Sequence, residues 1–180
     1  MDKIVMEALK YPIGHFEYSA KVSKAIVDGW IKDLEELPLI LERLVGDLTM
    51  EQLETPYRPD GWTIRQLVHH IADSHHHSYT RFKWALTENG PLIKAYDEKS
   101  WSSLSDAKTA TVELSLNYLK ALHAKLVFLL KSLDDQDLQK YYVHPDDKSK
   151  ITVKENIGKY AWHGRHHCAH IQGLLERKGW

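Results

Sequence analysis

The chain has 180 residues, enough for one domain with a sizeable apolar core and too few for two. Its 24 basic and 25 acidic side chains nearly cancel, so the charge balance indicates neither a nucleic-acid partner nor an anionic membrane. The one cysteine, Cys168, cannot form an internal disulfide, and no apolar run approaches the roughly 18 residues of a membrane span. The N-terminus also lacks a signal-peptide pattern. We therefore expect one soluble, cytoplasmic domain over residues 1–180.

Apolar residues recur at helical spacing in four long segments. The first covers about 23–45, and the second runs to about 87 from Thr63, a residue type that caps helices. The third covers roughly 112–133 and the fourth roughly 152–178. No internal repeat or strong strand alternation accompanies them. The pattern predicts an all-α fold, a four-helix bundle with long connecting loops.

Two long connections separate the predicted helices. Residues 88–110, "ENGPLIKAYDEKSWSSLSDAKTA", contain turn formers and few periodic apolar residues, which in a compact domain is typical of a functional or lid-like loop. We expect this loop on the substrate side of any site. Residues 134–150 form a second irregular connection. Connections of this length argue against a simple up-and-down bundle with short turns.

Most of the 12 histidines fall in two clusters, one within each of two predicted helices: positions 69, 70, 75, 76 and 77, and positions 163, 166, 167 and 170. On a helical projection of the last helix, His167 lies within the buried stripe and His163 lies at its edge. His166 and His170 fall further round, toward the solvent. His163 and His167 are one turn apart, so both imidazoles can bind the same metal ion.

In the second helix, periodicity does not choose a third ligand. His75 lies in the middle of the apolar stripe, His69 and His76 share one flank, and His70 and His77 share the other. A single interior histidine is more often a hydrogen-bonded core residue than a ligand, and exposed histidines on helices usually have no function. Two clusters on helices that can face each other nevertheless favour a metal site.

Several motifs resemble, in order and spacing, those of the YfiT-like metal-dependent hydrolases of the DinB superfamily. They are "YPIGHFEY", "TPYRPDGWTIRQLVHHIADSHHHSYTRFK", "AYDEKSW", "HPDDK", "YAWHGRHHCAHI" and "RKGW", and they span essentially the whole chain. The resemblance implies a DinB-like four-helix bundle, a homodimer, and one divalent metal per subunit held by three histidines. Matched residue by residue, these are His70, His163 and His167. The choice of His70 rests on the resemblance alone.

Three neutral imidazoles leave positions on the ion open, which is typical of a catalytic site that activates water. Zinc is the expected metal, and nickel would accept the same ligands. Gly164 stands where the H-E-x-x-H motif has its general base, which excludes that protease mechanism on this helix. Asp73, one turn from His70, is the candidate base, although a supporting or surface role fits it equally. Cys168 points into the apolar stripe, where a thiol is inert.

Three functions remain open. The principal prediction is a metal-dependent hydrolase that activates water on a small-molecule substrate. The alternative is a thiol S-transferase of the bacillithiol type, known among DinB relatives, in which the metal binds a low-molecular-weight thiol. The cations Arg81, Lys94 and Lys99 could then bind anionic groups. The third is a non-enzymatic metal-binding protein, for which the sequence lacks a convergent set of additional acidic ligands.

Overall fold

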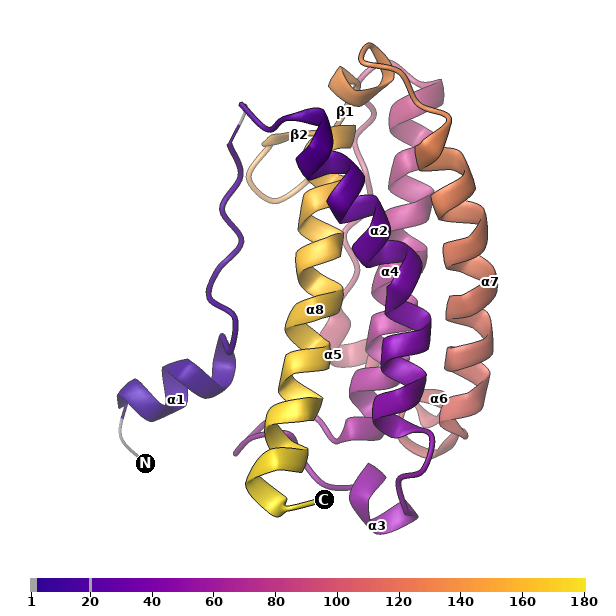
Figure 1. Ribbon diagram of the computed structural model, residues 1–180. Helices are drawn as coiled ribbons and strands as arrows, with labels where there is room; N and C mark the ends of the chain where they lie inside the picture. Colours follow the sequence, from indigo (N-terminus) through magenta and orange to yellow (C-terminus); the bar gives the residue numbers. More distant parts are fainter. Residues whose placement is uncertain (1–2, 20) are drawn as a thin grey trace.

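The computed structural model describes residues 3–19 and 21–180. Four long helices form its body: α2 (Lys24–Val45), α4 (Ile64–Thr87), α7 (Val112–Lys131) and α8 (Val153–Lys178) (Figure 1). These are the four helices that apolar periodicity predicts, with bounds that agree closely. The all-α fold and the four-helix bundle are thereby confirmed. Among the described residues, no helix combines the length and the apolar character needed to cross a membrane.

Local signals fix where the two histidine-bearing helices begin and end. The Thr63 hydroxyl accepts a hydrogen bond from the backbone N–H of Gln66, and the Gln66 side chain accepts one from the Thr63 N–H. This reciprocal pair satisfies two donors that the first turn of α4 leaves open. At the start of α8 the Thr152 hydroxyl accepts a hydrogen bond from the backbone N–H of Glu155. α8 ends at Gly179, whose φ of 68° is a left-handed conformation that glycine adopts without strain.

The order of the helices around the bundle differs from their order in the chain. α2 packs against α7 and α8, and α4 packs against the same two helices. The long helices α2 and α4, which follow each other in the sequence of the bundle helices, are therefore diagonal to each other, as are α7 and α8. α4 and α7 run in the same direction, so residues 88–111 return along the length of the bundle (Figure 1). The long connections are thus a consequence of this topology.

The connections contain more regular structure than their sequences predict. The short helices are α3 (Met50–Leu53), α5 (Glu98–Trp101) and α6 (Ser105–Thr109), and residues 134–150 include the 3-10 helix η1 (Asp137–Gln139) and strand β1 (Tyr141–Val143). Strand β2 (Lys150–Thr152) pairs antiparallel with β1, with Tyr142 opposite Ile151. The prediction of a wholly irregular connection over 134–150 is wrong, because three-residue strands are too short to give an alternating pattern.

The N-terminal segment, residues 3–19, lies outside the four-helix bundle beside α8 (Figure 1). It begins with α1 (Lys3–Lys10), a helix with no buried residue, and continues as an irregular chain. The carbonyl of Lys10 accepts a hydrogen bond from Nε2 of His170, and the ring of Phe16 lies 6.3 Å from that of Trp162. This segment therefore covers a flank of α8 that a bare bundle would leave exposed.

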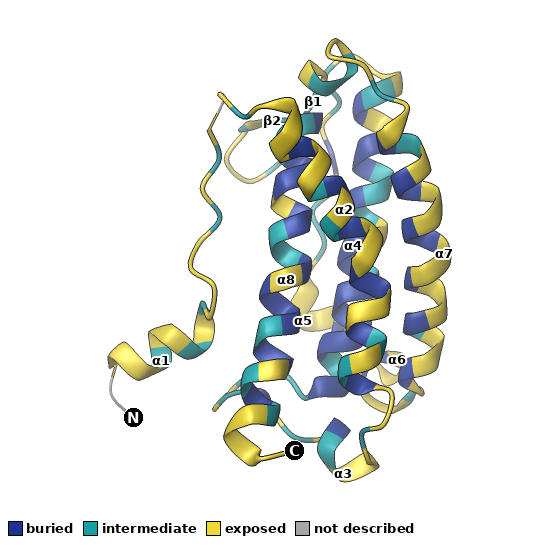
Figure 2. Cartoon of the chain, viewed as in Figure 1, coloured by how far each residue is buried: buried dark blue, intermediate teal, exposed yellow. Residues whose placement is uncertain are grey.

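The apolar core consists of two clusters, one toward each end of the bundle. One includes Leu41, Ile71 and Ile171, and the other includes Leu34 and Phe82. Figure 2 shows that the sides of the four long helices that face one another are buried. The buried polar side chains of α4, α7 and α8 include Ser74, His75, His123, His166 and His167. Polar groups buried in this way must find hydrogen-bond partners within the protein.

Candidate metal centre

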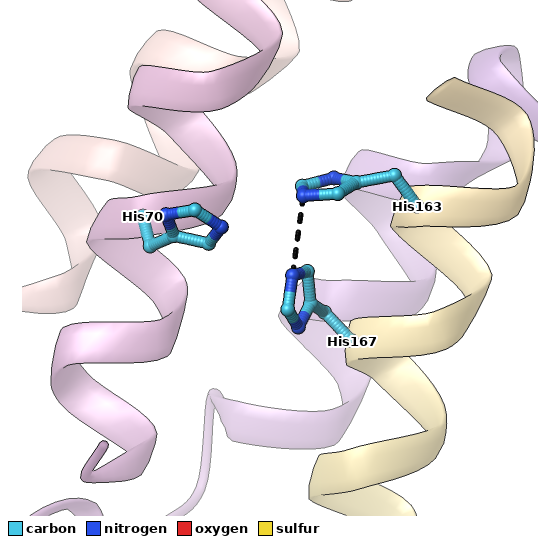
Figure 3. A group of neighbouring side chains, drawn as sticks. All are labelled: His70, His163 and His167. Atoms are coloured by element: carbon cyan, nitrogen blue, oxygen red, sulfur yellow. Dashed lines mark hydrogen bonds between the residues drawn. The ribbon is translucent and has the colours of Figure 1, made fainter. Parts of the chain in front are cut away.

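Three histidines from two helices converge between α4 and α8. His70, His163 and His167 each offer a ring nitrogen, and these atoms all lie within 4.8 Å of one another. Figure 3 shows the His70 ring on α4 pointing across to the two rings on α8. The Nε2 atoms of His163 and His167 are 3.1 Å apart. Two nitrogens bound to one tetrahedral zinc ion lie roughly 3.4 Å apart, so this pair already has nearly the required spacing.

A chain of buried histidines sets the tautomer of His163. Nδ1 of His123 lies 2.5 Å from the carbonyl oxygen of Leu34, Nε2 of His123 lies 3.0 Å from Nδ1 of His75, and Nε2 of His75 lies 3.2 Å from Nδ1 of His163. A carbonyl oxygen only accepts, so Nδ1 of His123 is the donor. Burial lowers the pKa of His123 to about 4 and the pKa of His75 well below its usual value, so both rings are neutral.

A neutral imidazole has one N–H donor and one acceptor nitrogen. Fixing the position of the proton on one ring therefore fixes its position on the next ring in the series. His123 donates to Leu34 and accepts from Nδ1 of His75, and Nε2 of His75 accepts from Nδ1 of His163. Burial also lowers the pKa of His163 and keeps that ring neutral. His163 therefore presents an unprotonated Nε2 to the triad.

A shorter series of hydrogen bonds sets the tautomer of His167. The carbonyl of Lys10 lies 3.0 Å from Nε2 of His170, which must be the donor. Burial lowers the pKa of His170 to about 4, so its Nδ1 is an acceptor, and it lies 3.3 Å from Nδ1 of His167. His167 donates through Nδ1 and presents an unprotonated Nε2.

The two series of hydrogen-bonded histidines together favour a cation between His163 and His167. Figure 3 joins Nε2 of His163 and Nε2 of His167, 3.1 Å apart, by a dashed line, and with the tautomers set as above two lone pairs face each other along it. With both chains intact, neither nitrogen carries a proton that could join them, and two facing lone pairs repel. Burial lowers the pKa of His70 to about 4, so the ring is neutral, and when its Nδ1–H donates to the Tyr96 hydroxyl 3.4 Å away, its Nε2 is the unprotonated nitrogen. Three neutral imidazoles in this arrangement fit a divalent metal ion.

The triad lies in the wall of a cavity of about 470 Å³. The other lining residues include Trp62, Ser74, Arg81, Ala95, Tyr96, Glu98, Lys159, Tyr160 and Trp162. Ala95, Tyr96 and Glu98 come from the 88–110 connection, which we expected on the substrate side. Of the three cations considered for anionic groups, Arg81 lines this cavity, whereas Lys94 and Lys99 are exposed outside it.

The prediction that His166 and His170 face the solvent is wrong. Their exposed fractions are 7% and 4%. The His170 ring stacks on Tyr57 with centroids 4.3 Å apart, and the His166 ring stacks on Trp162 with centroids 4.5 Å apart. A helical projection assigns the face opposite the apolar stripe to the solvent. It cannot predict that a separate segment, residues 3–19, covers the outer flank of α8.

His166, His167 and His170 form a second group whose ring nitrogens lie within 4.8 Å of one another. The two groups share His167, and one neutral imidazole has a single lone pair to donate. His170 already donates Nε2–H to Lys10. The hydrogen bonds therefore favour the group of His70, His163 and His167, and make His170 a support for the His167 ring.

Asp73, the candidate base, does not line the cavity, and among the described residues no hydrogen bond joins its carboxylate to the triad. Burial and, to a lesser extent, the nearby Asp106 raise the pKa of Asp73 to about 6. Besides the histidines of the two clusters, two polar groups that the sequence did not identify lie beside the triad. The Ser74 hydroxyl is 3.5 Å from Nε2 of His163, and Tyr96 contacts His70.

Comparisons with known proteins agree with this architecture. A family model of the DinB superfamily matches residues 33–171. A protein of Oceanobacillus iheyensis named "Putative metal-dependent hydrolase" is 47% identical over 171 residues, which cover 95% of this chain and 98% of that protein. YfiT of Bacillus subtilis is 49% identical over 172 residues, 96% of this chain and 97% of YfiT.

The solved structure of Bacillus subtilis YfiT superimposes with a TM-score of 0.94 and covers 96% of this chain and 99% of that one. It is described as a probable metal-dependent hydrolase with an unusual four-helix bundle topology. From the family match over residues 33–171 and the identity to these relatives, the chain belongs to the DinB superfamily.

Proposed function

We propose that the protein is a metal-dependent hydrolase of a small-molecule substrate, with one divalent ion per chain held by His70, His163 and His167. The observation that carries the proposal is the convergence of the three ring nitrogens within 4.8 Å of one another, with the Nε2 atoms of His163 and His167 3.1 Å apart. Zinc is the proposed metal, and nickel is the alternative that the same nitrogen donors accept. The names of the relatives point to the same class of activity.

A divalent ion at this position supplies Lewis-acid chemistry, which activates water and polarises a carbonyl or phosphoryl oxygen. The residues of the chain hold and shape the site around that chemistry. The two hydrogen-bonded chains keep the ligand rings in one tautomer and orientation. Trp62 and Trp162 form apolar parts of the cavity wall, and the Ser74 hydroxyl is placed to orient a polar group beside His163.

The metal assignment is tested by elemental analysis of the purified protein and of single alanine variants. We expect about one equivalent of zinc or nickel in the wild-type protein and in His166→Ala, and loss of the metal in His70→Ala and His163→Ala. His166 is the matched control because it belongs only to the second histidine group. Metal retained in His70→Ala but lost in His166→Ala would move the site to that second group and overturn the proposal.

The reaction class is tested with a panel of small esters, amides and lactones in the presence and absence of a low-molecular-weight thiol. Hydrolysis predicts turnover without thiol and incorporation of oxygen from isotopically labelled water. The thiol S-transferase remains the second candidate, because the buried cation Arg81 in the cavity suits a polar cosubstrate. A thiol adduct formed only when thiol is added would favour the transferase. Bound metal without turnover of any substrate in the panel would favour the non-enzymatic alternative.

A further inference from the structure

Arg81 is a buried cation without an acidic partner. Its exposed fraction is 6%, and among the described residues no carboxylate lies within ion-pairing distance of its guanidinium. Nη1 donates a hydrogen bond to the Tyr160 hydroxyl at 3.3 Å, and the Tyr142 hydroxyl is a second neutral hydrogen-bond partner of the side chain. Nε is buried and has no hydrogen-bond partner in the structure. Arg81 therefore keeps both its charge and a donor uncompensated.

Such an arrangement is costly for the folded protein by itself. Arginine stays protonated in proteins, and a buried charge is normally paired or fully hydrogen-bonded. Arg65 on the same helix shows the usual solution, because its side chain is equally buried and its Nε lies 2.6 Å from the Glu54 carboxylate. The contrast between Arg65 and Arg81 indicates that the partner of Arg81 comes from outside the chain.

The position of Arg81 indicates what that partner is. Arg81 lines the same cavity as His70, His163 and His167. It follows His70 by three turns on α4, about 16 Å along the axis, and helical side chains lean toward the N-terminus, which directs Arg81 back toward the triad. Lys159 also lines the cavity but is exposed to solvent, and desolvation followed by the charge of Arg81 lowers its pKa.

The carboxylates that line the cavity do not neutralise the charge of Arg81. Glu98 and Asp146 line it but are exposed, and Asp146 instead approaches Nδ1 of His144 at 3.7 Å, with 76% of its side chain accessible to water. Charges that exposed are screened by solvent, whereas the buried guanidinium is not. Arg81 is therefore the buried charge of the cavity wall, whereas the other charged side chains that line the cavity, Lys159, Glu98 and Asp146, are exposed.

We propose that Arg81 binds an oxoanion of the substrate, a carboxylate or a phosphate, so that the site takes small acids whose anionic group lies at Arg81 while the reacting bond lies at the histidine triad. The planar fork of a guanidinium matches either oxoanion through two parallel N–H donors. Nε–H is the free donor, and the Tyr160 hydroxyl on Nη1 holds the plane in position. The assignment of the reacting end rests on the proposed function, but anion binding at Arg81 does not require it.

The test is anion binding to the purified protein, with inorganic phosphate and succinate as separate probes and neutral succinamide as the control ligand. Binding is followed by the fluorescence of Trp62 and Trp162, which line the cavity, and by the NMR shift of the Arg81 Nε–H resonance. We expect phosphate or succinate, and not succinamide, to move the Arg81 resonance. Whichever of the two binds more tightly identifies the oxoanion.

Variants locate the binding group. Arg81→Met should weaken anion binding by about 10–100-fold, as expected for losing hydrogen bonds to a charged partner, and Arg81→Lys should weaken it less. Lys94→Met is the matched control, because it removes one exposed cation outside the cavity and should leave binding unchanged. The wild-type NMR titration decides the question even if Arg81→Met fails to fold.

Metal-free protein and His70→Ala separate this inference from the proposed function. Anion affinity that is lost on removal of the metal but unchanged in Arg81→Met would mean that the ion holds the anion, and would overturn the inference while leaving the metal site standing. Affinity that depends on Arg81 in both metal-loaded and metal-free protein supports it. An Arg81 Nε–H resonance that neither anion moves would refute it.

Discussion

Pro38 and His123 meet at one carbonyl oxygen, that of Leu34. Pro38 lies inside α2, has no N–H, and so leaves the carbonyl four residues earlier without its helical donor. Nδ1 of His123, on α7, lies 2.5 Å from that oxygen and fills the vacant place. The defect that proline introduces into α2 thus supplies the acceptor that starts the histidine chain to His163.

We expect His123→Leu to weaken zinc binding by about 10–100-fold, although His123 is not a ligand, because partners that orient metal-binding histidines have effects of this size. The substitution puts an apolar side chain of similar volume in place of the imidazole and leaves Nδ1 of His75 without its acceptor. Affinity is measured by competition with a chelator. The tautomer of His163 is read from long-range nitrogen–proton NMR correlations.

His123→Gln is the rescue variant, since its amide carries a donor for Leu34 and an acceptor for His75 and should recover part of the affinity. His76→Leu, an exposed histidine on α4, is the control and should bind zinc normally. Wild-type affinity in His123→Leu, together with an unchanged His163 tautomer, would show that the chain does not set the ligand.

The sequence predicts the helices well because their signals are local. Apolar spacing marks the buried stripe of each helix, and Thr63 and Thr152 cap the starts of α4 and α8 within one turn. The spacing of His163 and His167 is likewise a property of one helix, and the structure places both rings on the same side of α8.

The rest of the site depends on contacts between segments that are distant in sequence. His70 and His77 share one flank of α4, and the choice between them depends on which part of α4 faces α8, which periodicity does not contain. His123 meets His75 across 48 positions, and His170 meets Lys10 across 160. Pro38 within a helical pattern is the one local feature that relates to the hydrogen-bonded histidines leading to His163. Its effect can be recognised only when the packing of α7 against α2 is known.

Gly164 fits α8 against α2, and we expect Gly164→Ala to lower the free energy of unfolding by about 1–3 kcal/mol. A Cβ at Gly164 would lie 2.6 Å from Cδ2 of Leu37 and 3.0 Å from its Cδ1, and Leu37 is only 3% exposed, so it has no room to move. The better helix propensity of alanine, about 1 kcal/mol, does not offset such an overlap. Chemical denaturation measures the difference.

Gly173→Ala on the same helix is the matched control. Its Cβ would meet only the flexible Nη1 of Arg177, at 3.2 Å, so we expect it to be neutral or to stabilise the protein by up to about 1 kcal/mol. Leu37→Ala in the Gly164→Ala background should cost less than in the wild type, because the shortened side chain removes the overlap. Equal effects of the two glycine substitutions would contradict the packing explanation.

Cys168 should be inert toward thiol reagents in the folded protein. The side chain is 8% exposed, and burial raises the pKa of its thiol to about 12, so almost no thiolate exists at pH 8. Iodoacetamide labelling, followed by intact mass, should therefore be slow in buffer and fast in denaturant, where one adduct per chain forms. Labelling of the native protein at the denatured rate would mean that Cys168 is accessible and ionised. Cys168→Ala should retain the metal, because the thiol is not among the proposed ligands.

Asp73 should make the stability of the protein depend on pH. Burial, and secondarily Asp106, raise the pKa of its carboxyl from 3.8 to about 6 in the folded state. The folded protein therefore binds the proton more tightly than the unfolded chain does. The resulting stabilisation is fully present below about pH 4 and is lost as the pH rises through about 6.

We therefore expect Asp73→Asn to be more stable than the wild type at pH 7–8, by on the order of 1–2 kcal/mol after allowance for the partial exposure of the side chain. The gain should shrink as the pH falls from 6 to 4 and vanish below that range, because the wild-type carboxyl is then protonated in both states. Asp106→Asn removes the smaller cause of the raised pKa, so in that background the gain from Asp73→Asn should be smaller. The measurement is a series of denaturant titrations between pH 4 and 8 on the four proteins. A gain that stays constant across this range would mean that Asp73 titrates normally and that its burial does not penalise the charged form.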